Sequence, residues 1–148
     1  MAIAATLHTL AAAVLMGGLA FLYFVMRPAA GSVDPGVRLP LWRRTFQYFL
    51  PWLIAAALVL PATGYYMIAA DTDPPNGKIH LKHLASWLAN ALLIYVYLVP
   101  YRRMENAMGQ GERPRAARHL VQIHRIMLCA LIALVIATIL GTQGRLIR

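Results

Sequence analysis

The chain has 148 residues, of which 60% are hydrophobic and only 13% are charged, and its formal net charge is +9. A soluble domain typically carries about twice that charged fraction, so the composition excludes an ordinary soluble protein. The basic balance does not indicate nucleic acid as a partner, because nearly all the arginines lie between apolar runs or at their ends, where lipid headgroups and topology explain them.

Four apolar runs follow one another along the chain, over residues 3–26, 46–70, 80–101 and 121–140. Each has the length of about 20 residues that a helix needs to cross a bilayer. Membrane-spanning segments must satisfy their own backbone groups, and four segments cannot close a barrel. The predicted fold is therefore an all-α membrane protein, an antiparallel bundle of four transmembrane helices that forms one domain over residues 1–148.

The first run contains His8, and it is not expected to be a cleaved signal peptide. No lysine or arginine precedes Arg27, and the apolar run is longer than a signal peptide requires. An ionisable side chain inside a membrane span is costly and usually functional. Small residues surround His8 and would leave room for a flat cofactor: Ala4, Ala5, Ala11 and Ala12.

The arginines predict the orientation of the bundle. The segments after the first and third runs carry nine positive charges, namely Arg27, Arg38, Arg43, Arg44, Arg102, Arg103, Arg113, Arg115 and Arg118. The other side carries four, namely Lys78, Lys82, Arg145 and Arg148. The positive-inside rule places the first set in the cytoplasm and both termini outside, which in the inner membrane of a bacterium means the periplasm.

The third run carries polar residues at helical spacing. His80, His83, Trp87 and Asn90 recur every three or four residues, so they share one side of a helix. Asn90 falls at mid-membrane depth and is expected to find a partner inside the bundle. The stripe indicates either a binding surface or a polar seam that joins two helices.

Three histidines should meet near the periplasmic face, because His8 and the pair His80 and His83 lie near the outer ends of their helices. A haem b held by two histidines takes imidazoles from opposite faces of the porphyrin, usually from two helices, and His8 with His83 or His80 meets that condition. Lys82, with Lys78 and Arg145, is placed to pair with the propionates. Copper is the alternative, bound by the same three imidazoles with Met67 as a further donor. His124, at the cytoplasmic end, is a weaker candidate ligand.

An ordered set of short motifs resembles a known family. The first run reads Leu7-His8 and later Gly17-Gly18, the second contains Phe49-Leu-Pro51-Trp52 and Ala62-Thr63-Gly64-Tyr65, and the third is followed by Pro100-Tyr101-Arg102-Arg103. This pattern resembles the copper resistance protein D (CopD) family of small integral membrane proteins. It is similar, more distantly, to the HemJ-type protoporphyrinogen oxidases. The first likeness implies copper uptake or tolerance. The second implies haem b and a membrane redox reaction that depends on residues matching His8 and His80 or His83 around Lys82.

The sequence therefore predicts a haem b protein that transfers electrons within the membrane, with a quinone or a respiratory subunit as its partner. If it is an enzyme, it is expected to be a haem-dependent membrane oxidoreductase. The predicted cofactor-binding residues are His8, His80, Lys82, His83, Trp87 and Asn90. Copper binding or transport through His8, His80 and His83 is one alternative. The other is a non-catalytic accessory subunit of a larger membrane complex, and a homodimer is compatible with each.

Overall fold

The computed structural model describes residues 2–70 and 77–146, with side chains described over residues 2–70 and 80–141. These residues form helices connected by short turns. In chain order the elements are α1 (Ala2–Ala20), η1 (Phe21–Met26), α2 (Arg27–Gly31), α3 (Pro35–Ala69), α4 (Gly77–Val96), η2 (Tyr97–Tyr101), α5 (Arg102–Gly109) and α6 (Arg113–Leu146).

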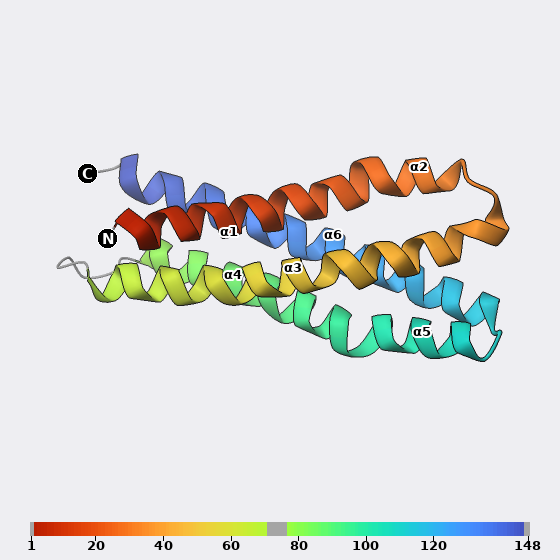
Figure 1. Ribbon diagram of the computed structural model, residues 1–148. Helices are drawn as coiled ribbons and strands as arrows, with labels where there is room; N and C mark the ends of the chain where they lie inside the picture. Colours follow the sequence, from red (N-terminus) through yellow and green to blue (C-terminus); the bar gives the residue numbers. More distant parts are fainter. Residues whose placement is uncertain (1, 71–76, 147–148) are drawn as a thin grey trace.

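Four continuous helical rods make up the molecule, and α1-η1-α2 and α4-η2-α5 each form one of them (Figure 1). The apolar stretches long enough to cross a membrane are Ala2–Gly31, Pro35–Ala69, His80–Gly109 and Arg113–Gly141. The starts of α1 and α4 lie at the same end as the ends of α3 and α6, whereas α2 and α5 lie at the other end (Figure 1). The prediction of an all-α, four-helix antiparallel membrane bundle is confirmed.

The connections at the α2 and α5 end are shorter than the sequence predicted. Most of residues 27–45 and 102–120 is helical, and the turns between the rods cover only residues 32–34 and 110–112. Asp34 caps α3, since its Oδ1 accepts a hydrogen bond of 2.7 Å from the amide of Gly36. Gly111 takes a φ of +75°, which allows the sharp reversal before α6. The arginines of these segments therefore lie on helices that extend the spans beyond the predicted bounds.

The two halves of the chain repeat one architecture, although the sequence shows no repeat. Each half is a helix, a π-helical segment, a short helix that opens on an arginine, a tight turn and a long helix. His8 and His83 each lie about four helical turns before the π-helical segment of their half. The halves therefore place these two histidines at corresponding positions in the bundle.

The core runs along the inner faces of all four rods, and large apolar side chains cover the outside. Leu15, Phe46, Leu93 and Ile123, one from each rod, are fully buried. The first two rods approach closely at Gly18, where an added Cβ would lie 2.8 Å from the Cζ atom of Phe49. The exposed outer side chains, which include leucine, isoleucine and aromatic residues, are those that a lipid environment favours.

Candidate cofactor site at the start of the first helix

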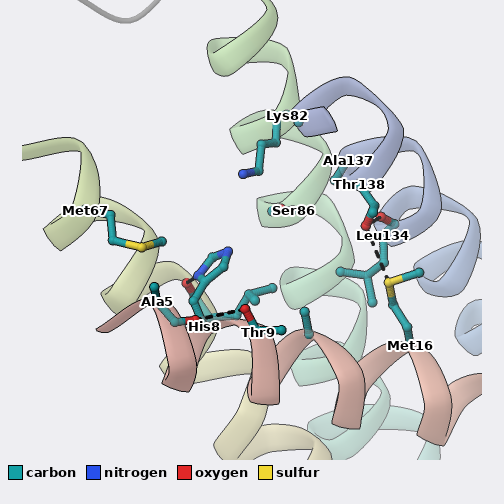
Figure 2. A pocket seen from close by; sticks show the side chains of 13 residues that line it. Ala5, His8, Thr9, Met16, Met67, Lys82, Ser86, Leu134, Ala137 and Thr138 are labelled. Atoms are coloured by element: carbon teal, nitrogen blue, oxygen red, sulfur yellow. Dashed lines mark hydrogen bonds between the residues drawn. The ribbon is translucent and has the colours of Figure 1, made fainter. Parts of the chain in front are cut away.

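A cavity of about 310 Å³ lies among the four rods, toward the end of the bundle where α1 begins (Figure 2). All four rods contribute to its wall. Its polar lining residues are His8, Thr9, Lys82, Ser86 and Thr138, and two thioethers, Met16 and Met67, also face it. The remaining lining residues are small or aliphatic: Ala5, Ala12, Leu60, Leu134, Ala137 and Gly141. The site thus combines a few polar groups with an apolar wall, as small-molecule sites do.

The imidazole of His8 is held by two hydrogen bonds to α3. Its Nδ1 lies 3.0 Å from the carbonyl oxygen of Leu60 and 3.0 Å from the hydroxyl of Thr63. A carbonyl oxygen can only accept, and the Thr63 hydroxyl itself donates to the carbonyl of Val59 at 2.8 Å. Nδ1 therefore carries the proton and donates, which leaves Nε2 as the basic nitrogen of the ring.

This arrangement is the one that orients a ligating histidine. A histidine that binds a metal usually donates its other ring N–H to a backbone carbonyl, a carboxylate or a water. Such a bond fixes the tautomer and the direction of the ring. In His8 the carbonyl of Leu60 fulfils that function, and the ring extends from α1 into the cavity (Figure 2).

Gly64 allows His8 to lie against the backbone of α3. A Cβ at this position would lie 3.3 Å from the Cε1 atom of His8 and 3.7 Å from its Nδ1. The first distance is shorter than an ordinary van der Waals contact, so a larger residue would displace the ring. The Ala62-Thr63-Gly64 motif of the sequence thus supplies both a hydrogen-bond partner and the space that His8 needs.

Lys82 brings a cation to the same cavity from α4. Its side chain is half-buried, and its stem lies close to α6, where a Cβ on Gly141 would be 3.1 Å from the Lys82 Cδ atom. Figure 2 shows the ammonium group and the His8 ring extending into one space from different helices. The cavity therefore holds a basic imidazole and a positive charge together.

The predicted polar stripe of α4 divides among three environments. His83 is half-buried, and its ring centroid lies 5.5 Å from that of Tyr65 on α3. The indole of Trp87 donates a hydrogen bond of 2.9 Å to the hydroxyl of the same tyrosine. His80 is exposed, and Asn90 is buried.

The residues that α4 presents to the cavity are Lys82 and Ser86, on the face next to this stripe. His80, His83, Trp87 and Asn90 are not among the described residues that line it. Burial of Ala89, Leu93 and Val96 sets the rotation of the helix, which the sequence pattern leaves undetermined. The structure thus brings His8 together with Lys82, and places His83 against Tyr65.

The cavity offers few side chains that could bind a metal ion on their own. Among residues with described side chains, no three His, Cys, Asp or Glu residues come together to hold a metal ion. Met67 does line the cavity with His8, as the copper alternative supposed. Sequence reasoning overlooked Met16, although His8, Ala12 and Met16 recur every four residues and hence share one face of α1.

Asn90 lacks the partner that the sequence led us to expect. Its side chain is 2% exposed, and neither its amide nitrogen nor its amide oxygen has a hydrogen-bond partner in the described part of the chain. Such a group in an apolar interior is unfavourable. Asn90 lies one turn beyond Ser86 on α4 and is not among the described residues that line the cavity.

His124 belongs to the aromatic core in the other half of the bundle. It is 7% exposed, and its ring stands edge-on to Trp42 with a centroid distance of 4.4 Å. Phe46 lies next to both rings, and the Nε2 atom of His124 has no hydrogen-bond partner among the described residues. His124 is therefore separated from the cavity around His8.

No family of known proteins, no curated protein and no solved structure matches the chain. These comparisons therefore add nothing to the assignment of the site.

Proposed function

We propose that the chain binds haem b in the cavity around His8 and transfers electrons within the membrane to a quinone or to a neighbouring redox subunit. The observation that carries this proposal is the anchored imidazole. Leu60 and Thr63 fix the Nδ1 side of His8, so that the basic Nε2 is the nitrogen that would bind an iron or copper ion.

The donor set favours haem over a bare metal ion. A porphyrin supplies four nitrogen ligands itself and needs only one or two axial ligands from the protein. A copper ion takes all its ligands from the protein, and the cavity contains one imidazole. When bound, haem would supply one-electron redox chemistry to the site.

The remaining lining residues would position the group and keep water out. Ala5, Ala12 and Ala137 have the small side chains that a flat ligand requires, and Lys82 would pair with a propionate. A haem macrocycle is larger than 310 Å³, so binding requires lining side chains to move. Met16 and Met67, which are long and unbranched, are the residues best able to do so.

The visible spectrum of the detergent-purified protein tests the proposal. Protein from haem-replete cells is expected to show a Soret band, with sharper α and β bands after reduction by dithionite. The His8→Ala variant should lose this spectrum because the imidazole that would hold the haem is gone. The matched control is His119→Ala, which removes a half-buried histidine near α5, at the other end of the bundle, and should keep the spectrum.

A colourless wild-type protein would contradict haem binding. Loss of the spectrum in His83→Ala as well as in His8→Ala would support the arrangement with two histidines that the sequence predicted. An intact spectrum in His8→Ala would remove the cavity from consideration as the haem site.

Copper is the second candidate, and one observation favours it. The thioethers of Met16 and Met67 line the same cavity as His8, and thioether and imidazole ligands suit copper(I). The resemblance to the copper resistance protein D family points the same way. Metal analysis of the purified wild-type and His8→Ala proteins distinguishes the two candidates. Copper would be favoured over haem as the cofactor if the wild-type protein contains stoichiometric copper and shows no Soret band, and if the His8→Ala protein has lost the copper.

The proposed location is the inner membrane of a bacterium, with the cavity toward the periplasm. The support is the charge distribution, because nine of the arginines belong to the segments around α2 and α5, whereas the cavity is lined by residues near the start of α1, at the opposite end. An electron carrier so placed would meet a quinone within the bilayer.

A further inference from the structure

Two adjoining hollows lie at the end of the bundle opposite to the His8 cavity. The first, of about 580 Å³, is formed by α5 and α6 and is lined by Arg103, Arg115, Arg118, His119 and Gln122. The second, of about 430 Å³, runs along α6 and is lined by Ala117, Arg118, Val121, Gln122 and Arg125. Arg118 and Gln122 line both hollows, which therefore form one continuous surface.

The first hollow carries an excess of positive charge. Of its three arginines, Arg115 pairs with Glu112 at 3.1 Å, and both side chains are exposed. For Arg103 and Arg118 no ion pair exists among the residues with described side chains, and both are exposed. One glutamate against three arginines leaves a net charge of two, so the hollow is complementary to a dianion.

The second hollow extends this basic surface toward the middle of α6, where Ala117 and Val121 add apolar side chains to Arg118, Gln122 and Arg125. Ala117 and Val121 are exposed on the outside of the span, and Val121 retains half of its accessible area. Both hollows are lined by α6, whose stretch Arg113–Gly141 is apolar enough to cross a membrane. A basic pocket continuous with an apolar track on a lipid-facing helix fits an amphiphile with an anionic head.

We propose that these hollows bind an anionic phospholipid whose headgroup carries two phosphates. Arg103 and Arg118 bind the phosphates, for which the planar guanidinium offers paired N–H donors. One acyl chain lies along Ala117 and Val121. Basic pockets between transmembrane helices on the cytoplasmic side are a recognised means of holding such lipids.

Native mass spectrometry of the detergent-purified full chain tests this site. The protein is titrated with cardiolipin (two phosphates), phosphatidylglycerol (one) and zwitterionic phosphatidylcholine. We expect one retained cardiolipin per chain, weaker retention of phosphatidylglycerol and no saturable retention of phosphatidylcholine. Each of Arg103→Gln and Arg118→Gln should weaken cardiolipin binding about five-fold, and the double variant roughly 30-fold.

Arg44→Gln is the matched control, because Arg44 is an exposed arginine of α3 at the same end and lines neither hollow. It should change the affinity less than about two-fold, since it removes only a diffuse charge. Equal weakening by Arg44→Gln and by the hollow variants would overturn the proposal, as would equal retention of phosphatidylcholine. The single variants keep the test decisive if the double variant does not fold.

Inorganic pyrophosphate, added in the same titration, distinguishes a lipid from a soluble phosphate. It is expected to compete only weakly, because it lacks the acyl chain that would lie along Ala117 and Val121. Pyrophosphate that binds as tightly as cardiolipin would assign the hollow to a soluble phosphate and overturn the lipid proposal. No part of this test depends on haem or copper.

Discussion

The position of His8 depends on the absence of a side chain at Gly64. We predict that Gly64→Ala weakens cofactor binding about 10-fold, the lower end of what loss of a supporting contact costs a ligating histidine. The added Cβ would lie 3.3 Å from the Cε1 atom of His8, so the ring must shift by a few tenths of an ångström from the position in which Leu60 and Thr63 hold it. Haem titration, followed by the Soret band, measures the change.

Gly17→Ala is the control for this substitution, since a Cβ on Gly17 meets nothing within 4 Å. Alanine favours a helix over glycine by roughly 1 kcal/mol, and both variants share that gain. Gly17→Ala should therefore keep full binding and unfold at a slightly higher temperature. Gly64→Ala with the same affinity as Gly17→Ala would show that the contact between Gly64 and His8 has no effect on the site.

The packing of α4 against α6 places Asn90 inside the bundle with both amide atoms unpaired among the described residues. We predict that Asn90→Leu stabilises the protein by about 1–3 kcal/mol, because it removes the cost of burying an amide that makes no hydrogen bond. Leucine is slightly larger than asparagine, so the gain falls toward the lower value if the site is tightly packed. Equilibrium unfolding in mixed detergent, followed by circular dichroism, measures the free energy.

Ala91→Leu provides the comparison, because Ala91 is exposed on the same helix and should tolerate a larger apolar residue with little change. Destabilisation by Asn90→Leu alone would mean that the amide has a partner, such as a bound water or the edge of a cofactor. The two variants therefore show whether the buried Asn90 amide only destabilises the protein or makes a contact that the protein uses.

Helical periodicity identified which residues of α4 share a face, but not which face meets the cavity. His83 and Trp87 lie together against Tyr65, as their spacing predicts. Lys82 and Ser86 face the cavity because the helix is rotated by its buried contacts, and those contacts involve residues distant in the sequence. Thr63 was noted in the sequence only as part of the motif from Ala62 to Tyr65, and its contact with His8 appears only when α1 and α3 are side by side.

At the scale of the whole molecule, hydropathy and length were sufficient to predict four spans and their antiparallel order, because the bilayer imposes both. The extents of the helices were not predictable in the same way. Arginines mark the end of an apolar run, but they do not end a helix, and the spans continue through Arg27 and Arg102. Helix ends were determined locally, at the Asp34 cap and at Gly111.

The two ends of the bundle differ in charge, and this difference predicts its orientation. We expect the turn at Gln110 to face the cytoplasm and the end of α3 at Ala70 to face the periplasm, because translocating the arginine-rich segments is unfavourable. The test uses a Cys129→Ala background, which removes the exposed native thiol. In intact bacterial cells, a membrane-impermeant maleimide should label the Ala70→Cys variant and not Gln110→Cys, and lysed cells should label both.

If only the Gln110→Cys variant were labelled in intact cells, the orientation of the bundle would be the reverse of the expected one. It would place the His8 cavity toward the cytoplasm and the arginine hollows toward the periplasm. A cofactor at His8 would then exchange electrons near the opposite membrane face, while its coordination by the protein would be unchanged. The labelling pattern therefore decides on which side of the membrane a partner of the proposed electron carrier must be sought, whether the cavity binds haem or copper.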